Sequence, residues 1–259
     1  MDWAYSLAGL IVGFIVGLSG MGGGSLMTPL LVLLFGIPPA TAVGTDLLYA
    51  SITKAGGVWV HQRRGNLDWR LVGWLAAGSI PTAVVTVLAL AALGIEEDDL
   101  EALVSAVLGG ALMLTAVALL LRDRLQQLSE RGSAGDRPAS TRRTAHLTLA
   151  TGAALGVLVT ISSVGAGVLG MAALLWLYPR LPSVKLVGTD IAHAVPLTAV
   201  AGLGHFYLGS VDLALLGYLL LGSLPGIYLG SQLSSRFPER LLRPALAGML
   251  IVVGGRLVW

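Results

Sequence analysis

The sequence predicts an all-α polytopic membrane protein that consists of two inverted repeats of five apolar segments each. Composition is the first observation: apolar residues make up 55% of the 259 residues and charged residues 12%, whereas soluble domains carry about 25% charged residues. The mean hydropathy of the chain is +0.83. The other two observations are that the apolar residues fall into ten segments and that motifs of the first half recur in the second half.

The ten apolar segments differ in length. We place them at residues 3–20, 25–36, 42–60, 71–94, 100–121, 146–162, 167–179, 185–204, 213–232 and 241–258. Most of them approach the length of about 20 residues that a helix needs to cross a bilayer, but 25–36 and 167–179 are too short. Short apolar pieces at matching places in two halves are typical of half-helices or broken helices in transporters. We therefore predict about eight full spans and two short segments.

A repeat relates the two halves of the chain. Gly44-Thr45-Asp46 recurs 144 residues later as Gly188-Thr189-Asp190. At the slightly shorter offset of 143 residues, the glycine-rich stretch Ser19–Ser25 aligns with Ser162–Val168. Matches at a nearly constant offset along both halves indicate an internal repeat. We therefore predict a first membrane repeat, a polar linker and a second membrane repeat, with the bounds 1–121, 122–145 and 146–259.

The distribution of arginine predicts how the repeats are oriented. The loop 61–70 carries three arginines, so the positive-inside rule places it in the cytoplasm. Its repeat partner, 205–212, contains no lysine or arginine and is placed outside. Because repeat-related loops then lie on opposite faces, we predict that the repeats are inverted. The arginine-rich linker 122–145 would be cytoplasmic, and both termini would lie outside.

The residue types argue against several classes of function. The chain has no cysteine, and its four histidines are spread along it, so we expect no metal site. The spans hold no nucleophile–base pair, so an intramembrane enzyme finds no support, and we expect no cofactor. The stretch Gly165–Gly170 fits a dinucleotide-binding pattern, but that pattern requires a preceding strand rather than an apolar helix. The net charge of +2 comes from arginine-rich loops and does not indicate a nucleic-acid partner.

Two glycine-rich stretches, Ser19–Ser25 and Ser162–Val168, each adjoin a short apolar segment. Non-helical backbone at membrane depth must be enclosed by protein or water, and amide groups at a helix start can bind an anion. An inverted repeat would bring the two stretches together near the middle of the membrane. We predict an anion site there, and packing turns are the alternative. The predicted ligands are Ser19, Gly20, Gly22, Gly23, Gly24, Ser25, Thr45, Lys54, Ser162, Ser163, Gly165, Gly167 and Thr189.

Four of the titratable residues inside the apolar segments are candidates for a functional role. Lys54 is near the centre of segment 42–60, where a charge is so costly that it should face a cavity or a partner. We interpret it as the charge that attracts the anion, and a structural ion pair with Asp190 is the alternative. Asp46 and Asp190 are repeat partners that we interpret as coupling or gating carboxylates, with helix capping as the alternative. His193 lies one turn after Asp190 and could share its proton, unless it is a core histidine.

The order and spacing of three motifs resemble one family of membrane proteins. These motifs are Gly17-Leu18-Ser19-Gly20-Met21-Gly22-Gly23-Gly24, then Pro38 with Ala42-Val43-Gly44-Thr45, and Arg64-Gly65-Asn66-Leu67-Asp68-Trp69. They are similar to those of the TauE/SafE family of sulfite and organosulfonate exporters, and the likeness covers essentially the whole chain. The resemblance implies a secondary active transporter of a bacterial inner membrane that exports a small sulfur-containing anion by alternating access. Coupling to an ion gradient, such as that of protons, is part of this expectation.

Alternatives to this function stay open at this point. The cargo could be another small anion, such as a carboxylate, thiosulfate or sulfate, because the predicted site would look the same. The protein could also be an anion channel, which needs a continuous pore. A small anion and the lipid bilayer are the expected partners. A homodimer is open too, because Gly222, Gly226 and Gly230 have the spacing of a dimerisation face, although such a face more often packs within one chain.

Overall fold

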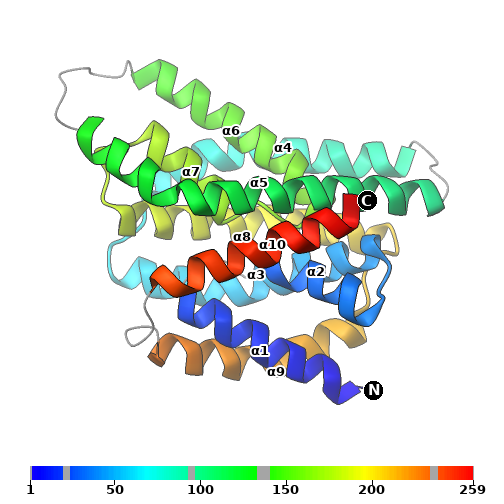
Figure 1. Ribbon diagram of the computed structural model, residues 1–259. Coiled ribbons are helices and arrows are strands. Elements are labelled where there is room, and N and C mark those ends of the chain that lie inside the picture. Colours follow the sequence, from blue (N-terminus) through cyan, green and yellow to red (C-terminus); the bar gives the residue numbers. More distant parts are fainter. Residues whose placement is uncertain (1, 20–23, 93–96, 133–140, 234–238, 259) are drawn as a thin grey trace.

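The computed structural model describes residues 2–19, 24–92, 97–132, 141–233 and 239–258. These residues form an all-helical bundle (Figure 1), as the sequence predicts. The helices in the described ranges are α1 (Asp2–Ser19), α2 (Gly24–Phe35), α3 (Pro39–Arg63), α4 (Trp69–Ala92), α5 (Glu97–Gly132), α6 (Thr141–Ser162), α7 (Val168–Leu177), α8 (Ser183–Tyr207), α9 (Leu213–Leu233) and α10 (Glu239–Val258). The start of α1 and the end of α10 lie at the same side of the bundle (Figure 1).

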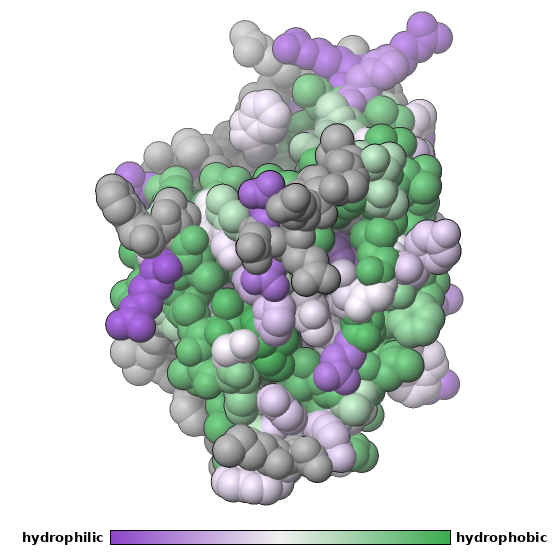
Figure 2. All heavy atoms as spheres, turned by 90° about the vertical axis from the view of Figure 1, so that its right-hand side faces the viewer, coloured by the Kyte–Doolittle hydropathy of each residue, from purple (hydrophilic) through white to green (hydrophobic). Residues whose placement is uncertain are grey.

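Five of the described helices are long and apolar enough to cross a membrane, by length and composition. They are α4, α8, α9 and the parts Asp99–Leu121 of α5 and Arg142–Ser162 of α6. The shorter apolar helices are Trp3–Leu18, Leu26–Phe35, Val168–Leu177 and Leu246–Leu257. By these criteria the described residues hold five spans, fewer than the eight that the sequence predicts. Figure 2 views the side where α1 begins and α10 ends, and apolar residues (green) surround separate hydrophilic groups (purple) there.

The two short apolar segments form short helices, as predicted. α2 has 12 residues and α7 has 10, well below the length of about 20 residues that spans a bilayer. At the end of α2, the amide of Gly36 bonds to the carbonyl oxygen of Val32, and the amide of Ile37 bonds to that of Leu31. Gly36 has φ 64°, and its bond to Val32 is that of the αL motif, in which the residue after the helix adopts a left-handed conformation that glycine tolerates readily. α7 begins after Gly167, another glycine with positive φ.

The start of the linker differs from the prediction. α5 continues to Gly132, past the expected segment end at residue 121, and α6 begins at Thr141. Leucine, glutamine, glutamate and arginine dominate the stretch 122–131, and these residues have high helix propensity. The chain therefore stays helical although its composition has turned polar.

Helices α1 and α9 pack against each other through glycines. A Cβ atom added at Gly222 of α9 would collide with the carbonyl oxygen of Ser6 in α1. Gly226 and Gly230 approach the backbone of α1 in the same way. Such close backbone approach is typical of small residues at helix interfaces in membranes. The glycine face of α9 therefore packs within the chain.

The pair of α4 and α6 repeats this arrangement. A Cβ atom at Gly156 of α6 would collide with the carbonyl oxygen of Ser79 in α4, and one at Gly13 of α1 would collide with that of Ser223 in α9. Gly13 and Gly156 are matched in the sequence at the offset of 143, and Ser79 and Ser223 at the offset of 144. Positions that match in the sequence thus make matching contacts in the structure.

The glycine contact predicts a loss of stability from one added methyl group. Gly222→Ala is expected to lower the melting temperature, because overpacking of this kind costs about 1–3 kcal/mol. Gly217→Ala in the same helix is the matched control, since no described atom lies within 4 Å of its added Cβ. Thermal unfolding in detergent, followed by tryptophan fluorescence, measures both variants. Equal melting temperatures would contradict the close contact.

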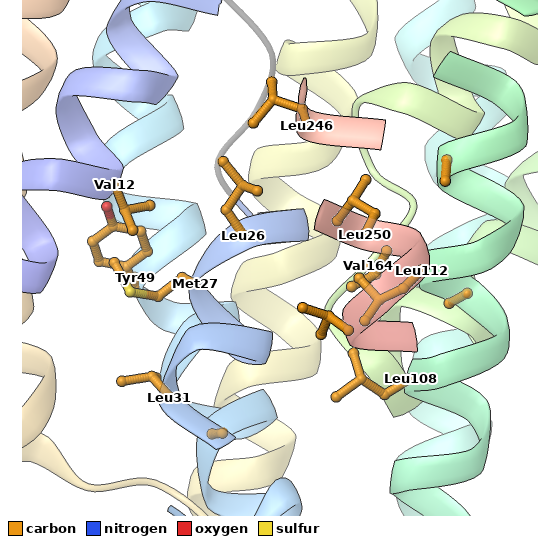
Figure 3. Close-up of a cluster of buried hydrophobic side chains, with 14 of the residues drawn as sticks. Val12, Leu26, Met27, Leu31, Tyr49, Leu108, Leu112, Val164, Leu246 and Leu250 are labelled. Atoms are coloured by element: carbon orange, nitrogen blue, oxygen red, sulfur yellow. The ribbon is translucent and has the colours of Figure 1, made fainter. Parts of the chain in front are cut away.

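The largest hydrophobic cluster combines side chains from both halves of the chain. Figure 3 shows buried residues of this cluster, among them Val12, Leu26, Met27, Leu31, Tyr49, Leu108 and Leu112 from the first half and Val164, Leu246 and Leu250 from the second half. These side chains come from α1, α2, α3, α5, the loop between α6 and α7, and α10. The two halves therefore share one core.

Candidate functional site

The four ionisable residues that the sequence singles out inside apolar segments are buried on two helices of the bundle. Asp46 and Lys54 belong to α3, and Asp190 and His193 belong to α8. None of the four is more than 7% exposed. Because α3 and α8 pack against each other, these side chains from the two halves lie in one region. The ammonium of Lys54 interacts electrostatically with the carboxylates of Asp190 and Asp46.

The loop that joins α6 to α7 has an unusual backbone conformation. The φ angles are 57° at Ser163, 117° at Gly165 and 128° at Gly167. Glycine tolerates this region because it has no Cβ. The amides of Leu169 and Gly170, at the start of α7, bond to the carbonyl oxygen of Gly165 at 3.1 and 3.3 Å. These two amides are therefore already paired and do not point to an open site.

Two hydrogen bonds attach this α6–α7 loop to α3. Ser163 Oγ donates to Asp46 Oδ2 at 2.9 Å, and Lys54 Nζ donates to the carbonyl oxygen of Ala166 at 3.1 Å. Asp46 Oδ2 also accepts a hydrogen bond from Thr28 Oγ1 of α2, at 2.5 Å. A loop from the second half of the chain is thus held by side chains from the first half.

Lys54 has capacity left to bind an anion. An ammonium carries three donors, and the carbonyl of Ala166 engages one of them. Among the residues that the structure describes, no carboxylate forms an ion pair with Lys54 within 4.0 Å. The structural pair with Asp190 is therefore not formed at that distance. The site can offer a ligand one positive charge and further N–H donors.

Asp190 and His193 contact different neighbours. Asp190 Oδ1 has no hydrogen-bond partner in the described part of the chain, and a Cβ added at Gly170 of α7 would collide with it. His193 Nε2 lies 2.8 Å from Ser79 Oγ of α4. His193 Nδ1 has no partner among the described residues. The hydrogen bond of His193 therefore goes to α4 and not to Asp190.

Thr45 and Thr189 make repeat-related contacts with loops. Thr45 Oγ1 accepts a hydrogen bond from the backbone N–H of Asp212 at 3.1 Å. Thr189 Oγ1 accepts one from the backbone N–H of Asp68 at 3.0 Å. Lys185 Nζ lies 3.9 Å from Asp68 Oδ2 and adds an ion pair to the second contact. The two hydroxyls that we predict as anion ligands are thus engaged with the loops that follow α8 and α3.

The remaining predicted ligands lie around the glycine-rich stretches. Ser19 is the last residue of α1, and Gly24 and Ser25 begin α2. Ser162 is the last residue of α6, and its Oγ donates to the carbonyl oxygen of Leu158 at 2.7 Å. The predicted ligands that lie outside the described residues are Gly20, Gly22 and Gly23.

Three groups at the site are absent from the sequence prediction: the side chains of Thr28 and Ser79 and the carbonyl of Ala166. Ser79 belongs to a motif that recurs around Ser223, and this repeat is a signal that could have identified it. A backbone carbonyl leaves no such signal. No group of three or more His, Asp or Glu side chains that could hold a metal ion occurs within the described ranges.

Comparison with known proteins places the chain among membrane transporters. The family model described as "Sulfite exporter TauE/SafE" matches residues 5–257. The chain is 40% identical over 258 residues to the "Probable membrane transporter protein YjnA" of Bacillus subtilis, covering 100% of both chains. It is 32% identical to the "Probable membrane transporter protein YdhB" of the same organism, over 95% of this chain and 96% of that one. A "Probable membrane transporter protein" of Xylella fastidiosa is 27% identical over 97% of this chain and 93% of its own. No solved structure matches the chain.

Proposed function

The chain belongs to the TauE/SafE sulfite exporter family of membrane transporters, and from this premise we propose that it carries a small sulfur-containing anion such as sulfite or an organosulfonate. The proposed mechanism is secondary active export by alternating access across a bacterial inner membrane. The observation that supports an anion site most directly is the buried ammonium of Lys54 beside the α6–α7 loop. A charge in this position is costly unless a partner or ligand faces it.

The proposed anion site lies between Lys54 and the two glycine-rich stretches. The ammonium would supply charge and N–H donors, and backbone near Gly165 and Gly167 would complete the enclosure. An anion in a water-poor interior interacts with a nearby charge far more strongly than in bulk water. The amides of Leu169 and Gly170 at the start of α7 already bond to the carbonyl oxygen of Gly165. We therefore propose Lys54, and not the start of α7, as the main group that binds the anion.

We also propose that the repeats 1–121 and 146–259 are inverted, with the linker 122–145 in the cytoplasm and both termini outside. The matching contacts support this proposal: Thr45 bonds to the loop after α8, and Thr189 bonds to the loop after α3. In alternating access, one of these two contacts would open while the other stays closed. The arginines of the loop 61–70 and their absence from 205–212 supply the orientation.

Proton coupling is the proposed energy source, and Asp190 is the residue that we assign to it. The predicted coupling residues are Asp46, Asp190 and His193. Asp190 is buried, and its Oδ1 has no partner among the described residues, so a proton could bind there without breaking a hydrogen bond. Asp46 Oδ1 is also without a partner there, but Asp46 Oδ2 accepts two hydroxyl bonds that stabilise its charged form. Buried carboxylates in membrane spans commonly serve proton relays.

Proteoliposomes that contain the purified protein test the substrate and the mechanism together. Initial rates would be compared for sulfite, an alkanesulfonate, thiosulfate, sulfate and a carboxylate, each with and without a pH gradient. We expect a sulfur-containing anion to be preferred, its rate to saturate with concentration, and the pH gradient to change its accumulation. A preference for the carboxylate would contradict the substrate class. A rate that rises linearly with concentration would indicate a channel instead of a carrier.

A further inference from the structure

Asp46 Oδ2 is the meeting point of three separate elements. It belongs to α3, it accepts a hydrogen bond from Thr28 of α2, and it accepts another from Ser163 of the α6–α7 loop. The distances from the two hydroxyl oxygens to Oδ2 are 2.5 and 2.9 Å. All three side chains are buried. Hydroxyl bonds to a carboxylate are charge-assisted and are among the stronger hydrogen bonds in proteins.

The two partners of Asp46 come from the parts of the chain that carry both glycine-rich stretches. Thr28 lies near the start of α2, directly after the stretch Ser19–Ser25. Ser163 belongs to the stretch Ser162–Val168, directly before α7. One carboxylate oxygen therefore connects the two short helices that the repeat relates to each other. Its removal would break both of these hydrogen bonds and leave the bond from Lys54 to Ala166 as the remaining one between α3 and the α6–α7 loop.

The repeat partner of Asp46 has no such bridge. At the offset of 143 that aligns the glycine-rich stretches, Met171 corresponds to Thr28, and Gly20 corresponds to Ser163. Neither residue type has a hydroxyl group. The Oδ1 atoms of Asp46 and Asp190 both have no hydrogen-bond partner among the described residues, so the difference lies at Asp46 Oδ2, which accepts the two hydroxyl bonds. The two aspartates match in sequence, but they differ in what their carboxylates bind.

We propose that Asp46 is a positioning residue that holds the two short helices at the spacing which the anion site requires. It neither contacts the anion nor carries the coupling proton. The transport part of this inference rests on the proposed function, because it requires that the protein carries the anion. The bridge requires an acceptor oxygen at position 46 but no negative charge. The amide oxygen of asparagine has two lone pairs, so in Asp46→Asn it could accept the hydrogen bonds of both hydroxyls. Lys54 would still interact with Asp190 after such a change.

The absence of cysteine from the chain allows a direct test of the spacing. Leu34→Cys near the end of α2 and Trp176→Cys near the end of α7 would carry spin labels, since these two side chains are 74% and 70% exposed. Double electron–electron resonance spectroscopy in proteoliposomes then measures the distance between the two spin labels. We expect Asp46→Asn to keep the distance distribution of the parent protein and Asp46→Leu to broaden or shift it. An unchanged distribution in Asp46→Leu would overturn the proposal.

Thr28→Val and Ser163→Ala keep the test informative if Asp46→Leu does not fold. Each removes one half of the bridge and is expected to cause a smaller change in the distribution. Because both act through the same oxygen, the double variant should differ from the sum of the two single variants. Strict additivity, or no effect from either variant, would contradict a shared bridge.

Transport by the same variants separates positioning from proton coupling. Loss of the bridge in Asp46→Leu should raise KM for sulfite by about tenfold or more, because displaced short helices would no longer hold the binding groups in position. Asp46→Asn should keep KM within about twofold and retain its response to a pH gradient. Loss of that response in Asp46→Asn would identify a coupling residue instead. If the parent protein carries no sulfur-containing anion, the proposed function fails, while the label distances still test the bridge.

Discussion

Replacement of Lys54 by methionine is expected to abolish most anion transport while the protein still folds and inserts. Methionine fills a similar volume but lacks the ammonium that donates to Ala166 and faces the proposed anion site. Losing one hydrogen bond to a charged group costs about 1.5–3 kcal/mol, which corresponds to a rate reduction of at least about tenfold. Initial rates of sulfite transport in proteoliposomes measure the effect.

Lys185→Met is the matched control, because Lys54 and Lys185 are the two lysines of the chain. Lys185 is partly exposed, and its contact with Asp68 spans 3.9 Å. A pair of this kind contributes little, about 0–1 kcal/mol, so transport should stay near the parent rate. Elution volume and melting temperature confirm folding of both variants. A folded Lys54→Met protein that transports at the parent rate would remove Lys54 from the site.

Asp190→Asn is expected to uncouple transport from the pH gradient. Asparagine keeps the shape of the side chain but cannot take up and release the coupling proton. The groups that face Asp190 are Lys54 of α3 and Gly170 of α7, and His193 lies one turn along α8. Because the positive charge of Lys54, which would attract the anion, is unchanged, exchange of sulfite for sulfite should continue. Accumulation of sulfite against its gradient should be lost.

Labelled sulfite distinguishes these two activities in one preparation. Proteoliposomes are loaded with unlabelled sulfite for exchange, or are given a pH gradient without internal sulfite for accumulation. Asp46→Asn serves as the repeat-related control and should retain both activities. Accumulation by Asp190→Asn at the parent level would show that the coupling proton binds elsewhere. Loss of exchange as well would indicate that Asp190 is needed to form the anion site.

Most helices could be predicted closely because glycine or proline interrupts each apolar run. Segment 213–232 corresponds to α9 (Leu213–Leu233), and segment 167–179 corresponds to α7 (Val168–Leu177). The end of α5 could not be predicted in this way. Hydropathy marks where residues leave an apolar environment, at about residue 121, whereas helix propensity keeps the backbone helical to Gly132. The two signals coincide at most helix ends and separate here.

The burial of the ionisable side chains could be predicted from the sequence, but their contacts could not. The burial of Lys54, Asp46 and Asp190 is confirmed, because a charged residue in an apolar run has few alternatives. Their partners lie far away along the chain: Ala166 is 112 residues from Lys54, and Ser163 is 117 residues from Asp46. Which hydroxyl reaches a carboxylate depends on how the helices pack, and no local pattern contains that information.

The two threonines illustrate the same limit. The Gly-Thr-Asp motif predicts both threonines, Thr45 and Thr189, as anion ligands, and in the structure each accepts a hydrogen bond from the backbone N–H of an aspartate in a loop. The motif does not distinguish a hydroxyl that binds a ligand from one that holds a loop. That distinction required the positions of Asp68 and Asp212, which follow different helices from the ones that carry the threonines.

Sulfite uptake into proteoliposomes is the most direct measurement of whether this chain is a carrier for a sulfur-containing anion. Proteoliposomes loaded with unlabelled sulfite are diluted into labelled sulfite, and uptake of label is followed over time in the parent protein and in Lys54→Met. We predict saturable uptake that internal sulfite accelerates, that an excess of external carboxylate does not inhibit, and that Lys54→Met lacks. Uptake that does not saturate, or that a carboxylate suppresses as well as sulfite does, would contradict a sulfur-anion carrier.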